Sequence, residues 1–204
     1  TSGYGAEAYP NMTRFDWAVE LFPWFEYYLK GIGEEPTPYV QMQRNDGRWH
    51  LEETWPPEDV TMLEVSGDGD NQRVSSTSAE FEITLQISEG AIHISGLPTL
   101  HTDVTTGLCN GGQLFVTMRD SETGLRLGHA TMDVRYRDGG YDSKTTASLS
   151  NYRMLMEFNP MDVIVPSGSV TLQFAESGED YIPSPCAACG LLVGSFDLGL
   201  PLGV

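Results

Sequence analysis

Apolar residues are spaced in two ways along this chain: at a helical period near the N-terminus, and in alternation over most of the remainder. Between Thr13 and Lys30 they recur every three or four positions, which predicts an amphipathic helix with one apolar face formed by Trp17, Leu21, Trp24, Phe25, Tyr28 and Leu29. Thr13 and Asp16 predict an N-terminal capping box, and Lys30 followed by Gly31 predicts the C-terminal end. Pro23 has no N–H to donate to the preceding turn, so we expect a kink or a restart of the helix there.

The apolar face of this helix is too large to remain in water. Its aromatic rings alone would hide several hundred Å², at roughly 150 to 250 Å² each. We therefore expect the helix to dock either on the β-structure that follows or on a domain outside this chain. Residues 31–38 (GIGEEPTP) predict a linker, because their glycines, prolines and acids show no periodicity.

The alternating pattern begins with a predicted hairpin. Residues 39–43 and 48–51 alternate in polarity, and the tripeptide NDG (45–47) between them is a strong signal for a tight turn. Trp49 points to the same face as the leucine two positions on, so we expect it to anchor the core. The W-P-P sequence (55–57) predicts a stiff exit with the tryptophan ring over the sheet edge.

Further strands follow at intervals of about ten residues, a spacing typical of sandwiches and barrels. We predict them over residues 60–65, 79–87, 91–104, 112–120, 125–136, 151–158, 169–175 and 190–198. The connections are rich in Gly, Asp, Asn and Pro. So many short strands need two layers to bury their apolar faces, and the predicted fold class is therefore all-β: a jelly-roll β-sandwich preceded by an N-terminal helix.

Charge narrows the classes of partner. The chain has 29 acidic residues against 11 basic ones, a net charge of −18, and its lysines are Lys30 and Lys144. So acidic a fold repels phosphate backbones and anionic lipid, which argues against nucleic acid and membrane as partners. A solvated acidic surface is the simpler interpretation; adaptation of a soluble, cytoplasmic protein to high salt is the sharper one. Composition alone does not separate the two.

The sequence contains no window of about 18 apolar residues that would predict a membrane span. It opens with TSGYGAEAYP, which has neither an initiator methionine nor the pattern of a signal peptide. We therefore expect a piece of a longer protein, and we leave its compartment and its oligomeric state open.

Candidates for nucleophilic catalysis are weak. The G-x-S-x-G signature is absent, and the nearest match is a G-x-C-x-G around Cys109, followed by a predicted strand instead of the helix that a nucleophile elbow requires. Cys186 and Cys189 form a C-x-x-C pair, which fits a labile disulfide, half of a zinc site without its second ligand pair, or two idle thiols. We favour idle thiols and predict no catalytic residue in this chain.

Metal ligands are also sparse. The histidines, each expected on a different strand, are His50, His93, His101 and His129. Because His93 lies between two isoleucines, we expect it to face solvent or to make a structural hydrogen bond. The sequence DGDN (68–71) resembles the start of a calcium loop, but Arg73 stands where the required glycine belongs and no glutamate closes the loop, so an acidic turn is favoured. The adjacent pairs Glu34-Glu35 and Glu52-Glu53 would point apart in a strand, and we predict no metal or cofactor site.

Aromatic residues leave a second class of function open. Rings that could stack on sugars are those of Trp49, Trp55, Tyr136, Tyr141, Tyr152 and Tyr181, although such rings more often fill a sandwich. An independent carbohydrate-binding module is therefore the alternative function. A metal- or thiol-dependent enzyme is a third.

Several stretches, in this order, resemble the X-Pro dipeptidyl-peptidase and cocaine-esterase-like (CocE/NonD) hydrolases. They are WFEYYLKG with its proline-containing linker, NDGRWHLEETWPP, IHISGLPTLHTDV (92–104), RYRDG (135–139), NPMDVIVPSG (159–168) and AESGEDYIPSP (175–185). The resemblance covers the chain from about Thr13 to its end. It departs where SVTL (169–172) follows P-S-G, since the family usually has a His or similar residue leading an Arg-containing strand there, and in the CAACG near the end.

The resemblance implies a non-catalytic C-terminal domain, a jelly roll similar to galactose-binding domains. Residues 1–35 would be the helical end of an α/β-hydrolase core and its linker, and residues 36–204 the sandwich. The Ser-His-Asp triad would then lie in the upstream core, which is the implied partner, and no triad residue can be placed on this sequence. We expect the domain to stabilise that core and to wall its active-site entrance.

Overall fold

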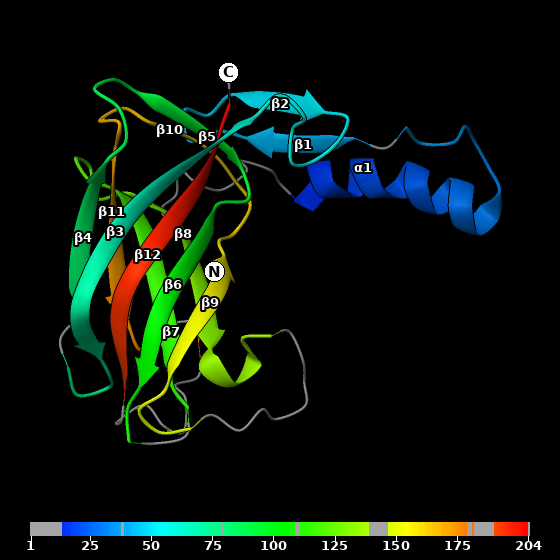
Figure 1. Ribbon diagram of the computed structural model, residues 1–204. Helices are drawn as coiled ribbons and strands as arrows, with labels where there is room; N and C mark the ends of the chain where they lie inside the picture. Colours follow the sequence, from blue (N-terminus) through cyan, green and yellow to red (C-terminus); the bar gives the residue numbers. More distant parts are fainter. Residues whose placement is uncertain are drawn as a thin grey trace.

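A computed structural model describes residues 14–37, 39–78, 80–108, 111–138, 147–178, 181 and 190–203. Strands account for most of the secondary structure and helices for a small part, which confirms the all-β prediction. Figure 1 shows two sheets packed face to face and a helical arm that projects from one end of them. The elements are α1 (Arg14–Phe25), η1 (Glu26–Lys30), β1 (Val40–Gln43), β2 (Trp49–Glu52), β3 (Thr61–Val74), β4 (Phe81–Gln86), β5 (Ile92–Gly96), β6 (Thr99–Thr106), β7 (Gln113–Asp120), β8 (Arg126–Asp133), η2 (Val134–Tyr136), β9 (Asn151–Glu157), β10 (Met161–Val165), β11 (Ser169–Ala175) and β12 (Leu191–Leu202).

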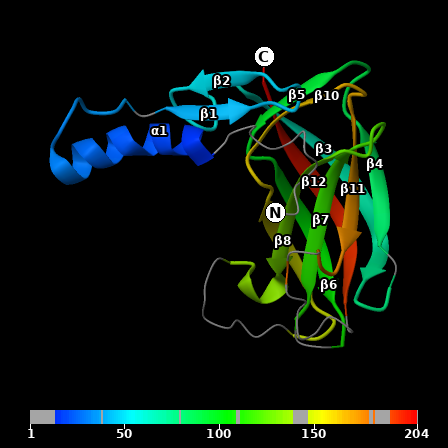
Figure 2. The same ribbon diagram turned by 180° about the vertical axis from the view of Figure 1, so that it is seen from behind.

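Strand β12 organises the larger sheet, whose order is β10-β5-β12-β6-β9 with β3 also paired to β12. The pairing of β3 with β12 runs from Leu191↔Val74 to Leu202↔Thr61, and the pair Leu202↔Ile94 attaches β5 at the far end. The smaller sheet has the order β4-β11-β7-β8, and the paired strands of both sheets run antiparallel. Figure 2, seen from behind, shows this smaller sheet in front of the larger one.

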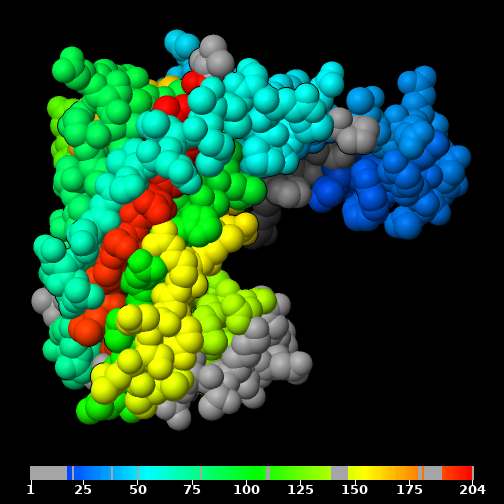
Figure 3. Space-filling view, in the orientation of Figure 1, coloured from blue at the N-terminus to red at the C-terminus, as the bar shows by residue number. Residues whose placement is uncertain are grey.

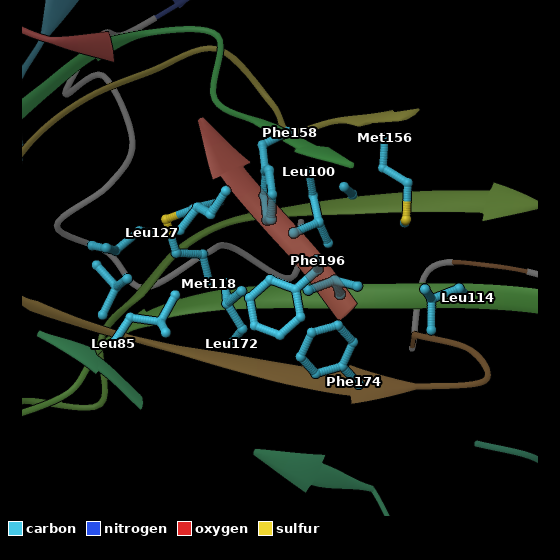
Figure 4. Close-up of a cluster of buried hydrophobic side chains, with 14 of the residues drawn as sticks. Leu85, Leu100, Leu114, Met118, Leu127, Met156, Phe158, Leu172, Phe174 and Phe196 are labelled. Carbon is cyan, nitrogen blue, oxygen red and sulfur yellow. The ribbon is translucent and has the colours of Figure 1, made fainter. Parts of the chain in front are cut away.

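The core lies between the two sheets, where the inward residues of each strand meet (Figure 4). Phe174 of the smaller sheet and Phe196 of the larger one are fully buried, and their ring centroids lie 5.6 Å apart. Phe81 stacks on Phe174 at 4.8 Å. The side chains that pack around these rings are fully buried: Leu100, Leu114, Met118, Met154, Met156, Leu172 and Leu198. The alternation read from the sequence therefore marks the buried face correctly in these central strands.

One predicted loop is wrong: residues 66–73 continue strand β3. The glycines there permit close packing, because a Cβ on Gly67 would lie 2.2 Å from the Phe196 ring and one on Gly69 would lie 2.6 Å from the carbonyl of Val193. Asp70 and Asn71 have φ of 52° and 54°, opposite an irregularity in the register of β12. The turn-forming residues thus form a bulge within a paired strand.

Other strands also differ from the prediction: the one predicted over 125–136 ends at Asp133, and the one predicted over 190–198 continues to Leu202. The single strand expected over 91–104 is divided into β5 and β6 at Gly96, whose φ of 140° favours glycine, and Pro98, which has no N–H for a ladder. Strand β10 was not predicted, because its five residues lie between two turn-like sequences. They are mostly buried, so an alternating pattern is absent.

The interior of the helix differs from the prediction of a kink or restart at Pro23. Pro23 lies within α1 and no restart occurs there; instead, the helix widens to a π-helix at Glu26. Its end is as predicted: Gly31 has φ of 66° and donates its N–H to the carbonyl of Tyr27 at 2.9 Å. None of the helices in the described ranges is long and apolar enough to cross a membrane.

The hairpin is confirmed, but the role of Trp49 is not. Strands β1 and β2 pair through Gln43↔Trp49 across the predicted turn. They form a sheet of their own beyond the end of the sandwich, so Trp49 is 37% exposed and Leu51 65% exposed. Period-two alternation correctly predicted a strand here. It does not indicate whether a second layer packs on the apolar face of that strand, and in this two-stranded sheet Trp49 and Leu51 remain exposed.

Candidate functional site

The most distinctive surface is the apolar flank of the helical arm, formed by α1 and η1. Figure 3 shows this arm standing away from the body of the molecule. The most exposed side chains are those of Phe22, at 63%, and Leu29, at 73%. They continue into a surface that also includes Val19, Leu21, Trp24, Phe25, Tyr28 and Ile32, each at least 39% exposed. The sandwich therefore leaves uncovered the face that the sequence predicted to dock.

Rings on this flank pack against one another. Trp24 lies 5.3 Å from Phe25 and 4.9 Å from Tyr28, measured between ring centroids. Tyr28 also donates a hydrogen bond to Glu35 at 3.2 Å, which ties the end of the helix to the linker. Desolvation, followed by the contact with this carboxylate, raises the pKa of Tyr28. The flank is thus an ordered cluster of rings.

The hairpin that carries the arm is held to the sandwich by Asn45. Its side-chain amide donates to the carbonyl of Ile164 at 2.7 Å and its side-chain oxygen accepts from the N–H of Ile164 at 2.8 Å. Asn45 therefore extends the ladder of strand β10 as a neighbouring backbone would. Asp46 braces the same turn, since it accepts from the N–H of Arg48 and from Arg44, and these bonds lower its pKa.

A hollow lies between the arm and the body in Figure 3, bordered below by β9 and η2. Leu155 of β9 is 41% exposed and Tyr136 of η2 is 40% exposed. Both elements therefore carry an exposed apolar side chain. The shape is that of a bracket open on one side.

The outer face of the larger sheet is polar. Arg153 of β9 contacts Asp103 of β6 at 3.1 Å and Asp197 of β12 at 2.5 Å. Ser195 donates to Asp103 at 2.6 Å, and Ser66 donates to Asp197 at 2.7 Å. The hydroxyl of Ser195, followed by Arg153, lowers the pKa of Asp103; the hydroxyl of Ser66, followed by Arg153, lowers that of Asp197. The network joins four strands, and both serine hydroxyls donate their hydrogen bonds to carboxylates within it.

The outer face of the smaller sheet carries a buried aromatic cluster. His129 is 4% exposed, and its Nε2 lies 2.7 Å from the hydroxyl oxygen of Tyr181. Both rings lie 5.4 Å from Phe115. A cavity of about 320 Å³ adjoins them, lined by Arg119 and Arg126 among others.

The predicted candidates are not brought together by the fold. His50, His93, His101 and His129 lie on β2, β5, β6 and β8, and His93 makes the expected structural hydrogen bond, to Asp162 at 2.5 Å. The described ranges contain no group of three or more His, Cys, Asp or Glu residues that could hold a metal ion. The three cysteines, Cys109, Cys186 and Cys189, lie outside the described residues, as does Tyr141.

The aromatic residues weighed as a sugar platform are dispersed. Trp49 belongs to the projecting hairpin, Tyr136 to η2, and Tyr181 to the buried cluster with His129. Tyr152 lies under Arg137, whose guanidinium carbon is 4.1 Å from the ring centroid. Among the described residues, therefore, these rings do not share one face.

Two structural groups were missed at the level of sequence. Asn45 was recognised as a turn residue, and its bond to a strand 119 positions away has no local signal. The Arg153 network has a weak one: Asp103, Arg153 and Asp197 each occupy a polar position in an alternating strand, and opposite charges on neighbouring strands pair.

No protein-family model matches the sequence, and the search of curated proteins found no match. Solved structures are similar in fold. A CocE/NonD family hydrolase from Staphylococcus aureus superposes with a TM-score of 0.62 at 11% identity, over 94% of this chain and 46% of that one. An aminopeptidase from a marine sediment archaeon (Thaumarchaeota archaeon) gives 0.61 at 12% identity, over 90% and 43%. An α-amino acid ester hydrolase gives 0.59 at 13% identity, over 90% and 44%. This chain thus shares a fold with part of several hydrolases and spans less than half the length of each.

Proposed function

We propose that this chain is the C-terminal part of a serine hydrolase of the CocE/NonD and X-Pro dipeptidyl-peptidase type. Residues 1–35 are the last helix of the α/β core and its linker, and residues 36–204 are a non-catalytic jelly-roll domain similar to galactose-binding domains. The domain stabilises the core and walls its active-site entrance, while a Ser-His-Asp triad upstream performs the hydrolysis.

The uncovered flank of the arm carries this proposal. Its four aromatic rings are 41 to 63% exposed and present about 400 Å², taking roughly 200 Å² for a fully exposed ring. Its aliphatic side chains bring the exposed apolar surface to the order of 600 Å², at the upper end of what monomers expose. A stable interface buries about 800 Å² on each partner. The arm therefore provides most of one such interface.

The occupant we propose is the hydrolase core of the same polypeptide. The three hydrolases named above continue for more than half of their length beyond the part that this chain matches. A core that lies in the bracket would contact both the arm and the sandwich, which explains why the arm is held out by a hairpin and not folded down.

Hydrogen exchange tests the docking. In the isolated 204-residue chain, amides of α1 are expected to exchange rapidly, because little tertiary packing protects them. In the longer polypeptide they are expected to be protected, and only that polypeptide should hydrolyse X-Pro-nitroanilides or acyl esters. Slow exchange in the isolated chain, together with a dimer in sedimentation, would assign the flank to a second copy. Turnover by the isolated chain that persists in Cys109→Ala would contradict its non-catalytic role.

A further inference from the structure

At the end of the sandwich opposite the hairpin, the β3–β4 connection and the end of β11 enclose a cavity of about 250 Å³. Its lining is unusual in composition: besides Val74 and Ala175, it consists of Ser75, Ser76, Ser78, Ser177, Glu80 and Glu176. All six polar side chains present oxygen, and the described residues that line the cavity include no Lys, Arg or His. The cavity therefore offers acceptors and two carboxylates without an internal cation.

Glu176 is the residue that needs a partner. It is 5% exposed, and its Oε1 is buried without a hydrogen-bond partner. A buried carboxylate oxygen that has lost water and gained no donor is costly. Glu80, by contrast, accepts a hydrogen bond from the amide of Gln173 through Oε2. That contact holds Glu80 at the wall of the same cavity.

From this arrangement we infer that the cavity binds a divalent cation, and that the cation is Ca²⁺. Calcium takes six to eight oxygen ligands and tolerates irregular geometry, so two carboxylates, serine hydroxyls and water suit it. Zinc prefers nitrogen and sulfur ligands, which the lining does not provide. The volume suffices for a cation that keeps several of its waters, each of which needs about 30 Å³.

The site would join the two sheets. Val74 ends β3 of the larger sheet, whereas Glu80 precedes β4 and Glu176 follows β11 of the smaller one. A cation held by these carboxylates would therefore fix the sandwich at the end farthest from the arm. This inference is independent of the proposed hydrolase function.

Calcium titration of the 204-residue chain tests it, after removal of metal with a chelator and at constant ionic strength. We expect calorimetry and native mass spectrometry to show one tightly bound Ca²⁺, and the unfolding temperature to rise by about 5 to 10 °C at a hundredfold excess over Kd. Glu176→Gln should abolish the rise, and Glu80→Gln should weaken binding at least tenfold. Glu82→Gln is the control. Glu82 is exposed on β4, so this substitution removes the same charge at a position outside the cavity.

Glu176→Gln also separates a cation site from a merely buried acid. Without calcium the amide should be at least as stable as the wild type, because it removes an unpaired buried carboxylate; with calcium the order should reverse. Absence of a bound Ca²⁺ in the wild type would overturn the proposal. So would an equal response in Glu176→Gln and Glu82→Gln, because it would assign the effect to the acidic surface as a whole. If Glu176→Gln does not fold, the stoichiometry in the wild type and the Kd of Glu80→Gln decide.

Discussion

The double substitution Phe22→Asp with Leu29→Asp separates the arm's role in the isolated chain from its role in a longer hydrolase. Both side chains are more than 60% exposed, at 63% and 73%. In the isolated chain they bury little, so replacing them should change the free energy of unfolding by no more than about 1 kcal/mol, mainly through helix propensity.

The same substitution should be severe where the arm is docked. Full burial of a Phe or Leu side chain contributes about 1.5 to 3 kcal/mol, and scaling by the exposed fractions gives about 3 kcal/mol for the pair. Each aspartate left in the interface without a partner adds about 1 to 3 kcal/mol of desolvation. We therefore expect the longer hydrolase to lose about 5 kcal/mol or more, enough to separate the domain from the core.

Urea unfolding of both proteins, followed by circular dichroism, measures the contrast. The matched control is Lys30→Asp, which changes the net charge by the same amount but replaces a residue paired with Glu26 at 3.8 Å. Losing this exposed ion pair and the favourable interaction of Lys30 with the helix dipole should lower the free energy of unfolding by at most about 1 kcal/mol in either protein. A large loss in the isolated chain, or an equally small loss in both proteins, would refute docking through this flank.

The remaining predictions concern the sandwich. Asn45→Ala should cost about 1 to 3 kcal/mol and speed amide exchange in the hairpin, because two hydrogen bonds to β10 are lost. Phe174→Ala should cost about 3 to 5 kcal/mol in urea unfolding by leaving a cavity between the sheets. The pKa of Asp103 is lowered from 3.8, so its contribution to stability is present above that pH and lost as pH falls through the folded-state pKa. Arg153→Gln should therefore flatten the decline in stability below about pH 4, seen in urea unfolding across pH, and an unchanged acid limb would contradict this.

Strands β7, β9 and β11 were predicted to within a residue of their ends. In β9 the burial alternates along the strand, which gives period-two alternation a physical cause; β7 and β11 are mostly buried, and the turn-like residues on either side of them indicated their boundaries. The prediction failed for β10, which is short and lies between turn-like sequences, and for the second half of β3. In β3 the glycines that suggested a loop serve the approach of Phe196, a contact between residues 129 positions apart that local composition does not encode.

The candidate site divides in the same way. The apolar flank of the helix follows from a local period, and its need for a partner follows from its area. That the sandwich is not this partner could not be read from the sequence, since it depends on where the hairpin places the arm. Trp49 shows the limit most clearly: its pattern is that of a core residue, but its sheet of two strands has no second layer.

The position of Asn45 explains how the hairpin is mounted on the sandwich while the arm before it stays uncovered. Strand β10 lies at the edge of its sheet, and Asn45 fills one step of its free ladder with side-chain atoms. A hairpin attached through the edge of a sheet extends away from the core instead of over it. The helix that precedes the hairpin projects beyond the sandwich in Figure 1, so its apolar flank is left for a body that lies beside the sandwich, which is the place we propose for the hydrolase core.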